Sequence, residues 1–336
     1  MPGCCHVELA KTTTGSGVYA PYVNSTSFDV TAPLDADSVL IRDVGPRDGL
    51  QAIDQNVSLK AKITMANGLI AAGLRRIEAG SFVSPKAVPR MADSRQVLGA
   101  MPKAAAAREA LVVNVRGAHA AIEAGVDVLV GVISASDTFS HRNVHMSKAD
   151  AITELRRIAE VAETAALPVS VDLSAAFGCA FEGPVGVDVV ADAAEQVTST
   201  GAFEIVLADT IGAAAPNDIS AVVAAVRERV GSDVHLGLHL HDTRGLALTN
   251  ATAGLDAGIR RFDASVGGLG GCPFSPGATG NVCTEDLVHL FDALGLSTGI
   301  NLNELIAVAA AIEHELGTKL PSHMLRAGPR FSHLAK

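Results

Sequence analysis

The chain has 336 residues, 48% of them hydrophobic but only 4% aromatic, and a formal net charge of −10. This charge argues against a nucleic-acid partner, because no basic stripe is present to neutralise phosphates. A membrane partner is not expected either, because no apolar run approaches the roughly 20 residues needed to cross a bilayer. The length fits either two domains or one large α/β barrel.

The chain contains five cysteines, an odd number without any Cys-x-x-Cys spacing. No secretory signal or Arg-rich transit segment precedes them. We therefore interpret them as thiols in a reducing compartment and predict a cytoplasmic protein.

Residues 1–36 are rich in Thr, Ser, Gly and Pro and show no regular period. We expect an N-terminal arm or lid there, partly disordered or packed on a neighbouring subunit. From residue 38 onward, short apolar runs alternate with Ala-rich amphipathic stretches. The predicted strands are 39–44, 76–80, 111–115, 126–134, 169–174, 204–208, 235–241 and 261–266. The predicted helices between them are 59–72, 117–124, 148–165, 187–200, 216–230 and 249–257.

Eightfold alternation of strand and helix predicts a parallel sheet closed into a (β/α)8 TIM barrel over residues 37–283. An open doubly wound sheet is the alternative, but no Gly-x-Gly-x-x-Gly follows the first strand. Residues 284–336 are expected to add C-terminal helices, 285–294 and 302–316, and a basic tail from Pro321, packed on the barrel.

In such a barrel the chemistry lies at the C-terminal ends of the strands. The polar residues predicted there are Asp43, Arg47, Asp48, Glu78, Ser81, Asn114, Arg116, Ser136, Asp172, Ser174, Asp209, Thr210, His239, His241 and Asp242.

Two of these segments indicate a metal site. His239 and His241 are two apart on a predicted strand, so their imidazoles point to the same side. Together with Asp48 after the first strand they offer nitrogen and oxygen ligands for Mg²⁺, Mn²⁺ or Zn²⁺. The alternatives are hydrogen-bonded core histidines and, for Arg47 and Asp48, a structural salt bridge on a loop.

A Gly-rich loop follows the last strand and carries Cys272 near its centre and Asn281 at its end. Its glycines suit a loop that closes over a ligand. Cys272 can serve as an acid or base, or be an inert small residue. Asn281 can supply an amide oxygen to the metal, or cap the helix that follows.

Several segments together resemble the 3-hydroxy-3-methylglutaryl-CoA (HMG-CoA) lyase family, within the metal-dependent barrel aldolases and Claisen-type synthases. Val44-Gly-Pro-Arg-Asp-Gly-Leu-Gln51 resembles the family's strand-one segment. Further segments that match are residues 77–86, 207–212, 239–243 and 266–281. The resemblance covers residues 38–316, and its last loop is the most specific part.

The resemblance implies roles for individual residues. Asp48, His239, His241 and Asn281 match the metal ligands, with Mg²⁺ or Mn²⁺ as the cofactor. Arg47 matches the residue that neutralises the enolate, and Cys272 the loop cysteine that handles protons. Polar residues that support the site match Glu78, Asp209 and Glu285, and Asp43 stands, as a shorter acid behind Arg47, where the family usually has Glu.

The implied reaction is a retro-Claisen cleavage of HMG-CoA to acetoacetate and acetyl-CoA, with an acyl-CoA thioester as substrate and a homodimer or higher homo-oligomer as the expected assembly. Basic residues that could meet the CoA phosphates are Arg116, Arg142 and Lys319, although solvated surface charge is the alternative. A condensing enzyme of the isopropylmalate synthase type, and a binding protein on a degenerate barrel, are the competing hypotheses.

The chain departs from the family pattern at three places: Ala52-Ile53, where Asn-Glu is usual, Arg244-Gly-Leu246, where Tyr-Gly-Gln is usual, and Ala180, where Pro is usual. The first two changes are expected near the mouth of the barrel, where they remove polar groups and add one cation. They leave open another branched 3-hydroxyacyl-CoA as the substrate.

Overall fold

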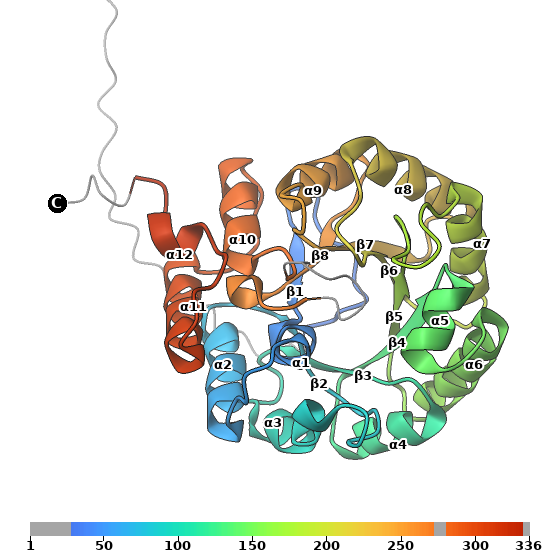
Figure 1. The fold of residues 1–336 in the computed structure, drawn as a ribbon, viewed down its shortest axis with the longest axis horizontal. Coiled ribbons are helices and arrows are strands. Elements are labelled where there is room, and N and C mark those ends of the chain that lie inside the picture. Colours follow the sequence, from blue (N-terminus) through green and yellow to red (C-terminus); the bar gives the residue numbers. More distant parts are fainter. Residues whose placement is uncertain (1–27, 272–279, 332–336) are drawn as a thin grey trace, which may run out of the picture.

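The computed structural model describes residues 28–271 and 280–331. Eight parallel strands close into a barrel in chain order, and helices surround it (Figure 1), which confirms the predicted fold class. The strands are β1 (Leu40–Asp43), β2 (Arg76–Ser81), β3 (Ala107–Leu111), β4 (Val128–Ser134), β5 (Val169–Ser174), β6 (Glu204–Asp209), β7 (His235–Leu240) and β8 (Arg261–Ala264).

Helices follow the strands on the outside of the barrel and continue beyond β8. They are α1 (Leu50–Ala52), α2 (Leu59–Ala71), α3 (Ser94–Ala100), α4 (Val115–Glu123), α5 (Asp137–Val144), α6 (Lys148–Thr164), α7 (Val187–Thr198), α8 (Pro216–Val230), α9 (Ala247–Asp256), α10 (Thr284–Ala293), α11 (Leu302–Leu316) and α12 (Met324–Ala327). Three shorter turns are η1 (Gly45–Gly49), η2 (Pro89–Met91) and η3 (Val266–Gly268). No helix in the described ranges is long and apolar enough to cross a bilayer.

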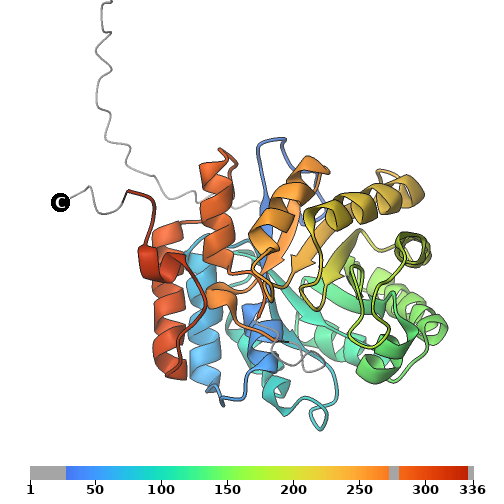
Figure 2. The same cartoon turned by 45° about the horizontal axis from the view of Figure 1, so that its top comes forward.

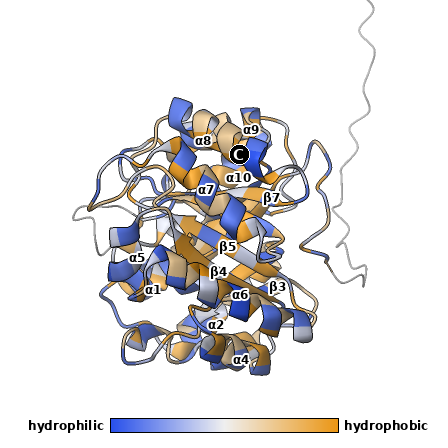
Figure 3. Cartoon of the chain, turned by 90° about the vertical axis from the view of Figure 1, so that its right-hand side faces the viewer, coloured by the Kyte–Doolittle hydropathy of each residue, from blue (hydrophilic) through white to orange (hydrophobic). Residues whose placement is uncertain are grey.

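The strands present two chemically different faces, as β5 shows. Val169, Val171 and Leu173 belong to the apolar core between the strands and the helices. The alternating residues Asp172 and Ser174 line a cavity within the barrel. Successive strand side chains point to opposite faces, so one short sequence supplies both the packing layer and the polar interior. Figure 3 shows hydrophobic residues in the central strands, and hydrophobic and hydrophilic residues mixed along the surrounding helices.

The predicted third strand was wrong in position. Residues 111–115 were expected to form it, but β3 runs over Ala107–Leu111, and Val115 begins α4. β3 carries Arg108 and Glu109, and these two charged residues made its sequence resemble a polar, exposed segment. Glu109 is buried and pairs with Arg76 at 2.5 Å, so the charge is compensated inside the barrel rather than exposed to water.

Four helices were not predicted from the sequence: α1, α3, α5 and α12, the last of which lies in the tail that was expected to be loop-like. α5 begins after Ser136, whose hydroxyl accepts a hydrogen bond from the Phe139 N–H. It is only 8 residues long, lies in the loop between β4 and α6, and ends at His145 with φ of 58°. Such a short segment has too few turns to show a clear apolar period.

The two ends of the described chain pack on the barrel in different places. At the N-terminal ends of the strands, Arg261 donates to the carbonyls of Val30 and Ala32, and Val30 packs on Ala107. Residues 28–36 therefore lie on the barrel itself, opposite the strand ends where chemistry was predicted. On the side of the barrel, α11 lies next to α2 (Figure 2), and the Asn301 N–H donates to the Ala72 carbonyl.

Candidate active site

The turn that leaves β1 places two charged side chains at the C-terminal mouth of the barrel. η1 is a π-helical turn, a conformation often found at functional sites, and its second residue, Pro46, lies in the first turn, where no backbone N–H is needed. Arg47 and Asp48 lie within this turn, and the Arg47 Nη1 lies 2.7 Å from the Asp48 Oδ1. The ion pair that was the alternative interpretation of these two residues is therefore present, and it lies at the mouth of the barrel.

The two histidines of β7 lie beside this turn. His239 and His241 are both buried, and their ring centroids are 5.2 Å apart. One ligand atom from each histidine and one from Asp48 all lie within 4.8 Å of one another. The structure thus brings the three predicted ligands together from opposite ends of the sequence.

The charges of these groups suit a cation. Burial would raise the pKa of Asp48, but the adjacent Arg47 and the two histidines outweigh it and lower that pKa to about 2. Burial, with His239 adding to it, lowers the pKa of His241 to about 4. At neutral pH Asp48 is therefore a carboxylate and His241 a neutral imidazole, the protonation states that bind metal. Burial would lower the pKa of His239, but Asp263 and Asp48 raise it.

Asn281 joins the cluster from the far end of the loop after β8. Its Nδ2 donates to the Asp48 Oδ2 at 2.8 Å and to the Leu269 carbonyl at 3.1 Å. A Cβ at Gly280 would lie 2.2 Å from the Gly268 carbonyl oxygen, so the two ends of the loop approach too closely for a side chain there. Cys272 lies outside the described residues.

The donors present fit a hard divalent cation. Among the described residues, the His241 Nδ1 and the Asn281 Oδ1 are buried atoms without a hydrogen-bond partner. Buried polar atoms are normally satisfied, and an unpaired donor or acceptor costs about 1–3 kcal/mol. Carboxylate, imidazole and amide oxygen together are a ligand set that Mg²⁺ and Mn²⁺ accept.

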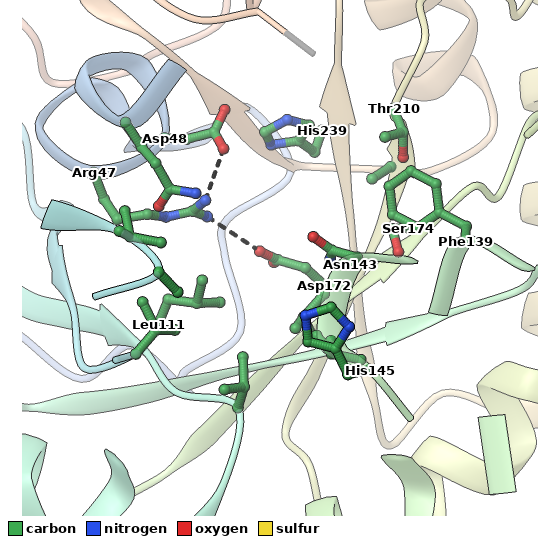
Figure 4. Close-up of a pocket in the computed structure, with 18 of the residues that line it drawn as sticks. Arg47, Asp48, Leu111, Phe139, Asn143, His145, Asp172, Ser174, Thr210 and His239 are labelled. Atoms are coloured by element: carbon green, nitrogen blue, oxygen red, sulfur yellow. Dashed lines mark hydrogen bonds and ion pairs between the residues drawn. The ribbon is translucent and has the colours of Figure 1, made fainter. Parts of the chain in front are cut away.

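Arg47 is held by three acids at the wall of the cavity. Its Nη2 lies 2.6 Å from the Glu78 Oε2 and 3.7 Å from the Asp172 Oδ2. Figure 4 shows the guanidinium reaching Asp48 on one side and Asp172 on the other. Burial would lower the pKa of Arg47, but the neighbouring carboxylates raise it, so the guanidinium remains charged. A fixed cation of this kind stabilises negative charge that develops nearby.

A cavity of about 410 Å³ lies in front of these groups. Its polar lining comes from Arg47, Asp48, His239 and His241 on one part, and from Asn143 and His145 after β4 on another (Figure 4). Its apolar lining includes Val83, Ala87, Val88, Leu111, Val113, Val132 and Phe139. A mixed lining with a few convergent polar groups is typical of a small-molecule site.

Three of the predicted supporting acids act on the backbone and do not line the cavity. Asp209 accepts hydrogen bonds from the Ala213 and Ala214 N–H groups, which fixes the turn after β6. Glu285 accepts from the Gly267 N–H at the start of the loop. Asp43, expected behind Arg47, instead accepts from the Gly45 N–H and the Thr284 hydroxyl.

The cation expected at the mouth is turned away from it. Arg244 Nη1 donates to the backbone carbonyls of Ile211 and Gly212, at 2.9 and 2.7 Å. It is not among the residues that line the cavity. This departure from the family pattern therefore stabilises a neighbouring loop, and Arg47 is the only arginine or lysine of the described chain that lines the cavity.

Of the three basic residues suggested for CoA, Arg116 lines a cavity that borders the site. With Arg95 it lines a second cavity of about 390 Å³ that shares Val83, Ser84 and Asn114 with the first. Arg142 stacks over the Phe181 ring at 4.4 Å, and Lys319 lies in the segment before α12.

Two charged residues next to the site, Arg42 and Asp263, were not predicted, and Asp172 was predicted only as a polar residue at the end of its strand. Asp263 Oδ2 lies 3.1 Å from the His239 Nδ1, and Arg42 contacts both acids. The available signal was a charged residue inside an otherwise apolar predicted strand. The partners could not be inferred, because Arg42 and Asp172 meet across the barrel.

Comparison with known proteins gives consistent results. A family model described as HMGL-like matches residues 38–312. The chain is 41% identical over 304 residues to an (R)-citramalyl-CoA lyase of Chloroflexus aurantiacus, covering 87% of this chain and 96% of that protein. It is 40% identical over 282 residues to a hydroxymethylglutaryl-CoA lyase of Pseudomonas mevalonii, covering 84% and 93% of the two chains.

A solved structure of an HMG-CoA lyase from Acenitobacter baumannii, in complex with coenzyme A and 3-methylmalate, has the same architecture. It superposes with a TM-score of 0.85 at 38% identity and covers 90% of this chain and 98% of that chain.

Proposed function

Because this chain belongs to the HMGL-like family, we propose that it cleaves HMG-CoA to acetoacetate and acetyl-CoA. The relatives named above are carbon–carbon lyases, and this chain is a carbon–carbon lyase as well. The observation that supports the proposal is the meeting of the cluster of Asp48, His239 and His241 with the Arg47 guanidinium at one cavity.

Residues Asp48, His239, His241 and Asn281 would hold Mg²⁺ or Mn²⁺. The bound ion would supply Lewis-acid activation of the substrate's tertiary hydroxyl group. The closed loop ends at Gly268 and Gly280 keep Asn281 against Asp48, so the ligand set is assembled by the fold. This arrangement limits the reorganisation that binding requires.

The cleavage breaks the bond between the carbinol carbon and the carbon next to the thioester. The hydroxyl proton passes to a base, the carbinol carbon becomes a ketone, and the bonding electrons form the acetyl-CoA enolate. Arg47, fixed by Glu78 and Asp172, stabilises the enolate oxygen. A proton then reaches the enolate carbon, a role that we assign to Cys272.

The thioester must enter from solvent with its CoA portion outside the barrel. We propose that it passes Val83, Ser84 and Asn114, which border both cavities, and that Arg116 faces its phosphates. An exposed guanidinium next to the entrance offers planar, charged donors that match phosphate oxygens.

Citramalyl-CoA is the second candidate substrate, favoured by the 41% identity to an (R)-citramalyl-CoA lyase. Its carboxylate is one methylene closer to the carbinol carbon, and the same cleavage gives pyruvate in place of acetoacetate. A single methylene changes binding by only about 1–3 kcal/mol. A few cavity-lining residues are therefore enough to separate the two activities.

Product analysis distinguishes the two substrates. Purified protein is stripped of metal with EDTA, reloaded with Mg²⁺ or Mn²⁺, and incubated in parallel with each thioester. Acetoacetate and acetyl-CoA from HMG-CoA, formed only after reloading, are the expected result. Pyruvate with a higher kcat/KM for citramalyl-CoA would replace the proposed substrate but keep the chemistry. Metal-independent turnover of both would contradict the mechanism.

A further inference from the structure

A buried chain of alternating charges lies behind the wall of the cavity. His239 Nδ1 lies 3.1 Å from the Asp263 Oδ2. Arg42 then binds Asp263 through two contacts, Nε to Oδ1 at 2.8 Å and Nη2 to Oδ2 at 2.5 Å. Both residues are nearly inaccessible, with Arg42 1% and Asp263 4% exposed. This chain is therefore part of the barrel interior and cannot bind substrate.

We propose that Arg42 and Asp263 are a positioning pair that fixes the imidazole of His239 for metal binding. The inference rests on the proposed function, since it assigns a role to residues behind a metal ligand. A ring whose Nδ1–H donates to a carboxylate can bind a metal only through Nε2. Asp263 thus selects both the tautomer and the ring orientation of His239.

The β-sheet register explains why this pair is available. His239 on β7 and Asp263 on β8 are direct partners in the ladder, and Asp263 is in turn the partner of Arg42 on β1. Three adjacent strands therefore place histidine, acid and guanidinium side by side at one level of the barrel. The backbone hydrogen bonds of the barrel fix this order, so the His239 ring is held by the most rigid part of the fold.

Arg42 links His239 to the other half of the site. Its Nη2 also binds the Asp172 Oδ1 at 2.7 Å, and Asp172 lies 3.7 Å from Arg47. Burial would lower the pKa of Arg42, but Asp172 and Asp263 raise it well above its usual value. One buried cation therefore stabilises the acid behind His239 and the acid beside Arg47.

The two histidines differ in a way that sharpens the assignment. The His239 Nδ1 contacts Asp263, whereas the His241 Nδ1 has no hydrogen-bond partner among the described residues. Only His239 thus has a carboxylate behind it. We expect the loss of Asp263 to affect metal binding through His239 alone, and not to disperse the whole ligand cluster.

Metal affinity tests the pair without reference to any substrate. The Mn²⁺ dissociation constant is measured by titration calorimetry for the wild type, Asp263→Asn, Arg42→Lys and Glu204→Gln. Glu204 is a matched control: it is 0% exposed and binds Arg76 at 2.7 Å within the same barrel, but it contacts no proposed ligand. Any general effect of removing a buried charge appears in this control.

We expect Asp263→Asn to weaken Mn²⁺ binding by about 10- to 100-fold, the usual effect of losing a carboxylate behind a ligating histidine. Arg42→Lys should weaken it less, and Glu204→Gln should leave the dissociation constant within about 3-fold of the wild type. Wild-type affinity in Asp263→Asn, or equal weakening in Glu204→Gln, would overturn the proposal. A wild type that binds no Mn²⁺ would instead refute the metal-dependent function itself.

Nitrogen-15 NMR of the wild type loaded with Mg²⁺ keeps the proposal testable if the variants do not fold. The expected signal is a His239 ring protonated at Nδ1, with that proton shifted downfield by its hydrogen bond to Asp263. A ring protonated at Nε2 would contradict the assignment, because Nδ1 would then be the metal-binding atom.

Discussion

The barrel interior contains two groups of buried charges, joined by a contact of 3.4 Å between Arg42 Nη1 and Glu109 Oε2, and they differ in how completely their polar groups are paired. The lower cluster, near the N-terminal ends of the strands, consists of Arg76, Glu109, Glu204 and Arg261. Both carboxylates bind Arg76, and Glu204 also accepts from the Ser170 hydroxyl. None of its side-chain nitrogens or oxygens is a buried atom without a partner in the described chain.

The upper cluster, near the C-terminal ends, is incompletely paired. Within the described ranges, Arg47 Nε, His241 Nδ1 and Asn281 Oδ1 are all buried without a hydrogen-bond partner. The same barrel therefore satisfies its buried charges at one end and leaves polar atoms unsatisfied at the other. Buried charge alone therefore does not indicate a site, whereas unpaired buried donors and acceptors beside a cavity do.

Asp48→Ala should have the largest effect and confirm that the upper cluster serves activity. Because it removes the only carboxylate of the ligand cluster, we expect acetyl-CoA release to fall by at least about 10³-fold, which is about 4 kcal/mol of transition-state stabilisation. Thermal denaturation of the same samples should show only a small change, because Asp48 is partly exposed. If Asp48→Ala lost stability but kept its activity, the upper cluster would serve stability, and the roles of the two clusters would be reversed.

Glu204→Gln should have the opposite profile. Removing one partner of a buried pair costs about 3–5 kcal/mol of unfolding free energy, because Arg76 is left with one carboxylate fewer. Urea denaturation measures this loss, and kcat/KM measured where the protein remains folded should stay close to that of the wild type. Strong loss of kcat without loss of stability would show that the lower cluster also serves catalysis.

Arg47→Lys tests whether the geometry of the upper cluster matters beyond its charge. A lysine keeps the cation but cannot contact Asp48, Glu78 and Asp172 at once, since it lacks the planar fork. We expect kcat to fall by about 10²-fold with KM nearly unchanged, since the contact matters most to the developing enolate. Steady-state kinetics with the preferred thioester measures it. A rise in KM alone would place Arg47 in substrate binding instead.

Asp43→Asn should give the smallest effect, one that appears only as a pH dependence of stability. Burial raises the pKa of Asp43 to about 7, above an unfolded value of about 3.9. Its contribution to stability is therefore fully present below about pH 4 and is lost as the pH rises towards 7, at a rate of at most about 1.4 kcal/mol per pH unit, whereas the effect on activity is small. The variant retains a hydrogen-bonding side chain between Gly45 and Thr284 but does not titrate.

The unfolding free energies of the wild type and of Asp43→Asn are measured at about pH 4.5, 5.5 and 6.5. The wild type should lose stability relative to the variant across this window. Parallel profiles would mean that Asp43 is ionised in the folded protein throughout.

Much of the site could be predicted because its groups are encoded locally. His239 and His241 are two apart on one strand, so any β conformation directs both rings to one side. Arg47 and Asp48 share a single turn after β1. These local relations, with the loop that ends at Asn281, were enough to identify the cluster before its geometry was known.

The remaining residues depend on contacts that a linear pattern does not contain. Asp209 and Glu285 were predicted to support the site, but their carboxylates bind backbone N–H groups nearby. Asp263 was overlooked, although it lies in register with His239. Whether an acid caps a turn or faces a histidine depends on the backbone around it, which no spacing reveals.

The barrel, the order of its strands and the ligand types at its mouth could be predicted from the chain alone, because period-two strands, intervening helices and strand-end motifs are local. Which charges meet depends on how the barrel closes. Arg42 and Asp172 are 130 residues apart and are brought to 2.7 Å by barrel closure. The shear that joins β1 to β8 is a property of the whole sheet, and it sets which side chains share one level.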